Sequence, residues 1–328
     1  MSTENFLEVQ GLKKYFDVGR ASFFSRQSRS LHAVDGVDFT LQRSEVIALV
    51  GESGCGKSTL ALLLMGLEDP SDGKVLFQGR DITHLNDVQR KDLRRKIQMV
   101  FQDPYESLNP TQTIEEIVTE PLVVHGFADT KDREERVRKA MEDSGLKPAE
   151  VYLKRFPHEL SGGQRQRVVI AAALVLEPEI ILADEPVSML DVSIRAEIIN
   201  LLAELRITRQ IAVIFITHDL GSVGFFADRV AVMYLGRIVE IGNMLEVLES
   251  PQHPYTKALL SVIPVPNPRL RHERIILQGE TPNPIDIPKG CRFHPRCPAA
   301  FEACNASDPP FAEISKTHRA ACLLLVNK

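Results

Sequence analysis

One glycine-rich segment of the chain combines residue types that bind phosphate. Gly51, Gly54 and Gly56 let the backbone bend so that its N–H groups converge on phosphate oxygens. Lys57 can then reach the β- and γ-phosphates, and the Ser58 hydroxyl can ligate Mg²⁺. The whole predicted phosphate loop is Gly51, Glu52, Ser53, Gly54, Cys55, Gly56, Lys57, Ser58 and Thr59. We therefore expect the chain to bind the phosphates of a nucleotide.

Two acidic residues stand at the end of a later apolar run. Residues 180–183 predict a buried strand, and Asp184 and Glu185 follow it directly. Carboxylates at the end of a buried strand are costly unless they bind a cation or take part in acid–base chemistry. Asp184 therefore fits Mg²⁺ coordination, and Glu185 fits polarising a water molecule for attack on the γ-phosphate.

Two further predicted strands end in polar side chains. Gln102 ends the apolar run 97–102, and its amide could reach Mg²⁺ or the attacking water. His218 follows the run 212–217 and could contact the γ-phosphate. A strand-end glutamine is usually a surface residue and an isolated histidine is usually structural. Both functional interpretations therefore depend on the presence of the phosphate loop.

Other segments could complete a nucleotide site. Tyr15 and Phe16 end the first apolar segment, and either ring could stack on adenine or belong to the core. A later helix is introduced by a serine N-cap and two glycines, which place a positive helix N-terminus where an anion could bind. That segment is Ser161, Gly162, Gly163 and Gln164. By itself, such a segment is normally a loop.

The elements that must position these residues alternate along the chain. Apolar strands are predicted over 46–50, 97–102, 180–185 and 212–217, with further strands over 6–9, 32–41, 74–77, 229–234 and 236–242. Helical periodicity covers 113–125, 129–144, 163–176, 192–205 and 255–262. This alternation predicts an α/β fold with a mainly parallel sheet. The helices within about 103–175 predict an inserted helical subdomain, and a polar stretch around 20–30 predicts a surface loop.

Composition excludes some classes of protein. The chain has 328 residues, of which 44% are hydrophobic and 25% are charged, which is typical of a globular protein with a substantial core. The formal net charge of −5 argues against a dedicated nucleic-acid binder. No apolar run approaches the about 18 residues of a membrane span, and no signal segment begins the chain. Work at a membrane would therefore depend on partner proteins.

A small cysteine-containing tail follows a composition change near residue 251. Its prolines at 264–268 predict a boundary, and Cys291, Cys297, Cys304 and Cys322 lie beyond it. Four thiols in a segment too small for its own core suggest folding around a metal. They fit Zn²⁺ or an iron–sulfur cluster, although the spacing differs from that of zinc ribbons, and plain buried thiols are a third possibility. Cys55 is expected to be a small packing residue.

The order of these motifs resembles the ATP-binding cassette (ABC) ATPases over residues 6–245. The Leu160–Gln164 signature is especially specific in this setting. The segments 253–260, 290–298 and 102–110 resemble the oligopeptide/dipeptide transporter ATPases of the dipeptide-permease F or oligopeptide-permease F type. The resemblance implies a P-loop NTPase fold with a RecA-like, mainly parallel sheet, an antiparallel β part, an inserted helical subdomain and a small Cys-rich C-terminal extension. It implies an ATPase domain over 1–245 and the extension over 246–328.

The resemblance also implies roles for the motif residues. ATP would bind the phosphate loop, with Ser58 and Asp184 on Mg²⁺ and Gln102 sensing the metal and water. Glu185 would be the catalytic base, His218 the γ-phosphate switch, and Phe16 or Tyr15 the adenine-stacking ring. Ser161, Gly162, Gly163 and Gln164 would complete the ATP site of an opposite subunit. In the tail the resemblance favours a [4Fe–4S] cluster over Zn²⁺. Ser44 and Met189 depart from the usual pattern without touching a catalytic role.

The expected assembly follows from the same resemblance. A second ABC ATPase subunit in a heterodimer, two membrane permease subunits and a periplasmic or extracellular substrate-binding protein are the implied partners, with no nucleic acid. The chain would lie peripherally on the cytoplasmic side of the inner membrane and power import of di- or oligopeptides. Alternative cargoes are nickel, an oligosaccharide, an opine or glutathione. A soluble ABC ATPase acting on DNA or ribosomes is the alternative from another class.

Overall fold

The computed structural model describes residues 5–20, 28–263 and 274–326. Most of the predicted loop around 20–30 and the proline boundary at 264–268 lie outside these residues. The strands are β1 (Leu7–Arg20), β2 (Ser28–Leu41), β3 (Val46–Val50), β4 (Asp72–Phe77), β5 (Arg80–Asp81), β6 (Ile97–Val100), β7 (Ile180–Asp184), β8 (Ala212–Thr217), β9 (Arg229–Tyr234), β10 (Arg237–Asn243), β11 (Phe311–Glu313) and β12 (Arg319–Ala321). The α-helices are α1 (Lys57–Leu64), α2 (Asp87–Lys96), α3 (Pro104–Ser107), α4 (Ile114–Val124), α5 (Thr130–Asp143), α6 (Glu150–Leu153), α7 (Gly162–Leu174), α8 (Val192–Thr208), α9 (Leu220–Val223), α10 (Met244–Glu249), α11 (Pro254–Ser261) and α12 (Leu323–Val326).

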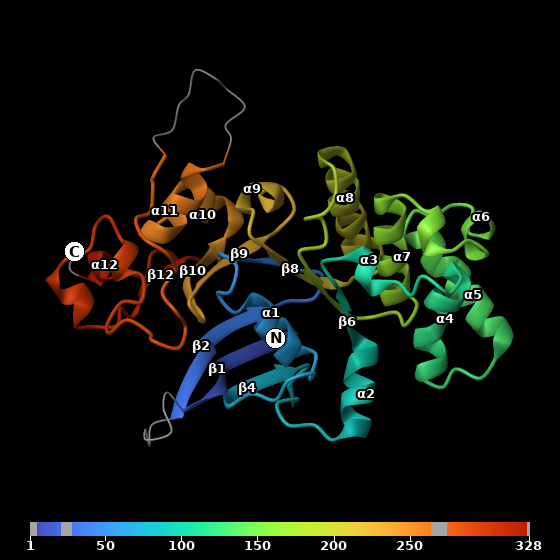
Figure 1. The fold of residues 1–328 in the computed structure, drawn as a ribbon, viewed down its shortest axis with the longest axis horizontal. Helices are drawn as coiled ribbons and strands as arrows, with labels where there is room; N and C mark the ends of the chain where they lie inside the picture. Colours follow the sequence, from blue (N-terminus) through green and yellow to red (C-terminus); the bar gives the residue numbers. More distant parts are fainter. Residues whose placement is uncertain (1–4, 21–27, 264–273, 327–328) are drawn as a thin grey trace.

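A large mixed sheet crosses the molecule in the order β11-β12-β10-β9-β3-β8-β7-β6 (Figure 1). Strands β9, β3, β8, β7 and β6 pair in parallel, whereas β9–β10, β10–β12 and β12–β11 are antiparallel. Every residue of β3 and β8 is buried, as expected for parallel strands covered on both faces. The predicted α/β fold with a mainly parallel sheet is therefore confirmed.

A second sheet, antiparallel and ordered β2-β1-β4-β5, lies against one side of the large sheet (Figure 1). Strand β1 is much longer than the predicted strand over 6–9. Its pairing with β2 shifts register between Val9 and Leu12, where Gly11 has a φ of +53°. Such an irregularity breaks the apolar alternation, so the pattern could not reveal the full strand.

Helices α3 to α7 gather beyond β6, at the end of the large sheet opposite the C-terminal tail (Figure 1). Helices α4 and α7 each begin with a capping box, formed by Thr113 with Glu116 and by Ser161 with Gln164. Their bounds agree with the predicted helices to within two residues. The caps explain why these helix starts were predictable from sequence.

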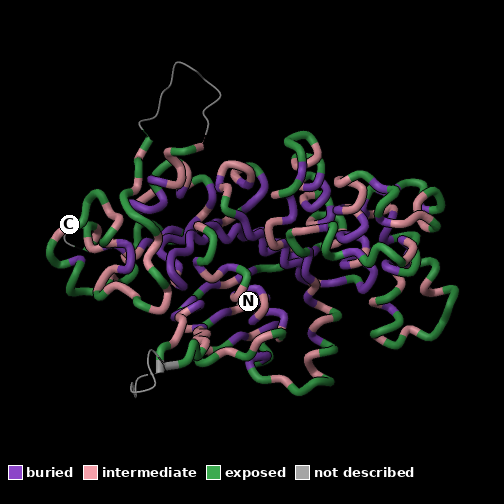
Figure 2. The backbone as a smooth tube through the Cα atoms, viewed as in Figure 1, coloured by how far each residue is buried: buried purple, intermediate pink, exposed green. Residues whose placement is uncertain are grey.

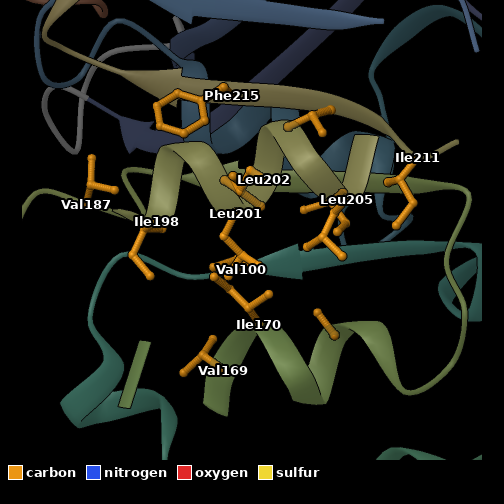
Figure 3. Close-up of a cluster of buried hydrophobic side chains, with 14 of the residues drawn as sticks. Val100, Val169, Ile170, Val187, Ile198, Leu201, Leu202, Leu205, Ile211 and Phe215 are labelled. Atoms are coloured by element: carbon orange, nitrogen blue, oxygen red, sulfur yellow. The ribbon is translucent and has the colours of Figure 1, made fainter. Parts of the chain in front are cut away.

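The main hydrophobic core joins these helices to the sheet. Figure 2 shows the buried positions concentrated along the large sheet. In Figure 3, Leu201 and Leu202 of α8 lie among Phe215 of β8, Val100 of β6 and Ile170 of α7. Because Val100, Ile170, Leu202 and Phe215 are fully buried, this packing fixes α7 and α8 relative to the parallel strands.

The C-terminal tail joins the large sheet through backbone pairing. Strand β12 pairs with β10, with Glu240 opposite Ala320 and Ile241 opposite Arg319. Beside this pairing, Nε2 of the buried His318 lies 2.7 Å from Oε1 of the fully buried Glu240. The sequence predicted only a small appendix here, because strands as short as β11 and β12 leave little pattern. No helix in the described part of the chain is long and apolar enough to cross a bilayer.

Candidate nucleotide site

The phosphate loop leads from β3 into α1. Gly56 caps α1 with a φ of +107°, and a Cβ built there would lie 2.0 Å from the Ala33 carbonyl oxygen. A Cβ at Gly51 would lie 2.2 Å from the Met233 carbonyl oxygen. Glycine is therefore required at both positions, by the backbone conformation at Gly56 and by close backbone approach at both.

Lys57 is held inside this loop. Its Nζ donates to the carbonyl oxygens of Gly51 at 2.7 Å and Glu52 at 2.9 Å, and the side chain is buried. The loop thus fixes a cation at the N-terminus of α1, where the helix end adds positive potential. This arrangement can attract the phosphates of a nucleotide.

Four predicted site residues follow parallel strands that are adjacent in the sheet. Gln102, Asp184 and His218 come at or just beyond the ends of β6, β7 and β8, and Glu185 follows Asp184. Oε2 of Glu185 lies 3.4 Å from Nε2 of Gln102 and 3.1 Å from Nδ1 of His218. The structure therefore brings Gln102, Glu185 and His218 together at the carboxyl edge of the sheet.

Asp184 faces the phosphate loop. Burial raises the pKa of its carboxyl group, and the neighbouring Glu185 adds to the increase, while a hydrogen bond from Ser58 and the charge of Lys57 oppose it. The Ser58 hydroxyl and the Asp184 carboxylate are oxygen donors of the kind that Mg²⁺ prefers. Together they fit the predicted Mg²⁺ position.

The two predicted aromatic residues are placed differently. Phe16 lines the cleft above the phosphate loop, together with Leu31 of the neighbouring strand. The Tyr15 hydroxyl instead donates to the Asp35 carboxylate at 2.5 Å, away from the cleft lining. Of the two rings, only Phe16 is positioned to meet a ligand in the cleft.

The cleft that unites these residues has a volume of about 960 Å³. It is lined by Phe16, Leu31, Ala33, Glu52, Ser53, Gly54, Gly56, Lys57, Ser58, Thr59, Gln102, Asp184, Glu185, His218, Leu259 and Pro284. Leu31, Ala33, Leu259 and Pro284 were not predicted from the sequence. These are ordinary apolar residues distant from the motifs, and no local pattern indicates them.

Ser161, Gly162, Gly163 and Gln164 lie outside this cleft. Ser161 is exposed at the start of α7, and its hydroxyl accepts from the Gln164 N–H at 3.3 Å. A Cβ at Gly163 would lie 2.6 Å from Cγ2 of Ile194. Within one chain, therefore, this segment and the phosphate loop do not form a single site.

The predicted metal site in the tail is not supported. Among residues 5–20, 28–263 and 274–326, no group of three or more histidine, cysteine, aspartate or glutamate side chains is arranged to hold a metal ion. Cys291, Cys297, Cys304 and Cys322 do come near one another, and burial followed by the other thiols raises the pKa of Cys291 to about 11. The described residues therefore give no support for the predicted [4Fe–4S] cluster or for its Zn²⁺ alternative.

Comparison with known proteins agrees with this geometry. Residues 34–188 match the ABC transporter family, and residues 239–304 match the C-terminal region of oligopeptide/dipeptide transporters. The oligopeptide transport ATP-binding protein AppF of Bacillus subtilis is 47% identical over 98% of both chains. The chain belongs to the ABC transporter ATPases. Its place in their oligopeptide/dipeptide family, predicted from the motifs, is confirmed.

Further similar proteins support the assignment of this chain to the ABC ATPases. The dipeptide transport ATP-binding protein DppF of Haemophilus influenzae is 48% identical over 96% of this chain and 95% of the relative. The structure of cbiO1 from Clostridium perfringens, part of an ABC transporter complex, has a TM-score of 0.65 at 32% identity, covering 75% and 91% of the two chains. A dimeric ATP-binding cassette bound to ADP and Pi, MJ0796, has a TM-score of 0.63 at 29% identity, covering 73% and 98%.

Proposed function

We propose that this ABC ATPase hydrolyses ATP to power the import of di- or oligopeptides. The observation that carries the proposal is the convergence of Lys57, Asp184, Glu185 and His218 in one cleft. The full-length similarity to two peptide transport ATP-binding proteins supports the choice of cargo. Nickel, oligosaccharide, opine and glutathione remain the alternative cargoes.

The ATP site supports a division of roles. Lys57 and the loop amides bind the β- and γ-phosphates, and Phe16 stacks on adenine. Ser58 and Asp184 would hold Mg²⁺, which supplies positive charge to the phosphates when bound. Gln102 orients the attacking water beside them.

Glu185 acts as the base that polarises water, and His218 holds its carboxylate in place while contacting the γ-phosphate. Glu185 has a φ of +46°, an unusual conformation for a residue with a side chain. Backbone strain at a reactive position is consistent with a carboxylate held in one direction. The N–H of Glu185 donates to the Ile216 carbonyl at 2.9 Å, which fixes that backbone to β8.

The assembly that we propose contains a second ATPase subunit. The separation of Ser161–Gln164 from the cleft supports a sandwich in which each subunit's signature completes the other's ATP site. We propose a heterodimer bound to two permease subunits and a substrate-binding protein, peripheral to the cytoplasmic side of the inner membrane. Residues 1–245 would form the ATPase domain and residues 246–328 the extension.

Transport by the complete complex tests this function. The chain, co-expressed with the proposed second ATPase subunit, the two permease subunits and the substrate-binding protein, should drive ATP-dependent uptake of a labelled dipeptide into vesicles. The Glu185→Gln variant provides the inactive control. Uptake of a non-peptide cargo without peptide uptake would contradict the cargo assignment. Co-purification with nucleic acid instead of permeases would favour the soluble alternative.

A further inference from the structure

Glu52, the second residue of the phosphate loop, is held by residues more than two hundred positions away. Arg296 donates from Nη1 to Oε2 at 2.8 Å and from Nη2 to Oε1 at 3.1 Å. The Thr281 hydroxyl donates to Oε2 at 2.6 Å. The Glu52 N–H donates to the Tyr255 hydroxyl oxygen at 2.9 Å. Both the side chain and the backbone of one loop residue are therefore fixed from outside the loop.

The contact between Arg296 and Glu52 is sheltered from solvent. Only 9% of the Arg296 side chain and 30% of the Glu52 side chain are exposed. Burial alone would raise the pKa of Glu52, but hydrogen bonds from Arg296 and Thr281 outweigh it and lower the pKa. Glu52 is therefore ionised at neutral pH. A two-pronged arginine–carboxylate contact fixes direction as well as distance.

The position of Glu52 affects the phosphate-binding groups directly. Its carbonyl oxygen is one of the two backbone carbonyl acceptors that orient the Lys57 ammonium. Its backbone leads into Ser53 and Gly54, which line the cleft. Movement of Glu52 would therefore shift both the lysine and the turn that presents N–H groups to phosphate.

The C-terminal segment that contains Tyr255, Thr281 and Arg296 also borders the opposite wall of the cleft. Leu259 and Pro284 line the cleft, and the Pro284 carbonyl accepts from the His32 N–H at 3.1 Å. The buried Arg292 pairs with Asp35 of β2, the strand whose Leu31 and Ala33 line the cleft. The segment therefore contacts both the phosphate side and the opposite side of the site.

We propose that Arg296 is a positioning residue for ATP: through its contact with Glu52, the C-terminal segment holds the phosphate loop in its binding geometry. The proposal rests on the proposed ATP site and deepens it. Arg296 acts on the loop, and the loop acts on the phosphates.

Binding of Mg·ATP to the full-length chain, measured by calorimetry, tests this role. Arg296→Gln should weaken ATP binding about tenfold, because one partner of a sheltered charge pair is removed. Arg296→Lys, which keeps the positive charge but cannot make the two-pronged contact with Glu52, should recover part of the affinity for ATP. Arg319→Gln is the matched control, since Arg319 belongs to the same segment and does not line the cleft. It should bind ATP as the unmodified chain does.

A double-mutant cycle separates positioning from direct contact with ATP. Glu52→Gln should weaken ATP binding about as much as Arg296→Gln. The double variant should bind ATP no more weakly than whichever single variant has the lower affinity. Tighter binding by Glu52→Gln would overturn the proposal, because it would mean that a released Arg296 binds the phosphates itself. If Arg296→Gln does not fold, Glu52→Gln tests the same contact from the other side.

Thermal unfolding supplies the structural readout. Without nucleotide, the Tm of Arg296→Gln should fall, because the sheltered Glu52 carboxylate loses its partner. The ATP-induced rise in Tm, measured from the variant's own nucleotide-free value, should also shrink. If the unmodified chain binds ATP and Arg296→Gln binds it equally well, the positioning role is wrong. If the unmodified chain itself binds no ATP, the proposed function fails.

Discussion

Nδ1 of His218 lies 3.1 Å from Oε2 of Glu185, the same carboxylate oxygen that Nε2 of Gln102 approaches to 3.4 Å. The Glu185 side chain is 17% exposed and that of His218 is 59% exposed. The carboxylate is therefore held between two partners from separate strand ends while its surroundings stay open to the cleft. This relationship makes Glu185 the first residue to test.

Glu185→Gln should abolish ATP turnover and leave ATP binding intact. The amide has nearly the shape of the carboxylate but cannot accept a proton, so turnover should fall by a factor of roughly 10² to 10⁴. Phosphate release from the assembled complex measures turnover, and calorimetry measures binding. Glu204→Gln on the exposed surface of α8 is the matched control. Retained hydrolysis by Glu185→Gln would refute the role of Glu185 as base.

Ser161→Ala should affect the assembled transporter more than the isolated chain. Ser161 lies outside the cleft of its own chain, so the isolated variant should bind ATP with unchanged affinity. Loss of the capping hydrogen bond should cost about 1 kcal/mol of stability, which Ser161→Asn should restore by capping α7 again. Turnover by the complex should fall with both variants if the serine contacts a partner's ATP. Weaker ATP binding by the isolated chain would show that the two-subunit assignment is wrong.

Leu202→Ala should destabilise the chain strongly. Leu202 is fully buried among β8, β6 and α7, so truncation leaves a cavity and should cost about 2–5 kcal/mol of the free energy of unfolding. Urea unfolding at neutral pH measures the cost. Ile207→Ala on the same helix, where the side chain is 75% exposed, should change stability by no more than about 0.5 kcal/mol. Equal effects at both positions would contradict the packing described here.

Stability should fall as pH drops below 6.5, and His253 should contribute to this fall. Burial lowers the pKa of His253 from 6.5 to about 3, so the folded chain keeps the ring neutral while the unfolded chain binds a proton. The contribution of the neutral His253 ring to the free energy of unfolding is thus fully present above pH 6.5. It is lost toward pH 3, by at most about 1.4 kcal/mol per pH unit.

His253→Asn can still cap α11 and should flatten the pH dependence of stability. In the unmodified chain, Nδ1 of His253 accepts from the Tyr255 N–H at 3.1 Å, and an asparagine oxygen can take that place. Urea unfolding at pH 7 and pH 5 compares the two chains. Asp35 does not interfere, because its pKa of about 2 lies below this window. Parallel pH curves for the two chains would rule out His253 as the source.

The fold was largely predictable because its central elements depend on local patterns. The apolar runs ending at Val50 and Thr217 are strands buried on both faces. Thr113 and Ser161 are N-cap residues, which mark the starts of α4 and α7 in the sequence. The antiparallel sheet was harder, since the bulge near Gly11 interrupts the alternation of β1. Strands β11 and β12 of the tail were not predicted, because strands this short leave no periodic signal. The pairing of β12 with β10 consists of Glu240 opposite Ala320 and Ile241 opposite Arg319.

The residues of the candidate site also fall into those that local motifs indicate and those that they do not. Lys57, Asp184 and Glu185 belong to short motifs, so their types and spacing were enough to select them as candidates, and all three line one cleft. Arg296 and Thr281 could not be predicted, because their role depends on a long-range contact with Glu52 that no spacing encodes. The four-cysteine prediction is not supported by the described residues. Spacing says which thiols share a segment and says nothing of how their sulfur atoms are arranged.

The pairing of β12 with β10 means that the tail also protects the protein from self-association. Without residues 318–321, the backbone groups of β10 that face β12 would be left unpaired, and such an open strand invites pairing with another molecule. Glu240, which accepts from the N–H groups of Gln252 and His253, would also lose its contact with His318. A chain that ends at residue 317 keeps every nucleotide motif and also Arg296, yet it would be prone to aggregate, so its loss of activity would reflect insolubility instead of a defective ATP site.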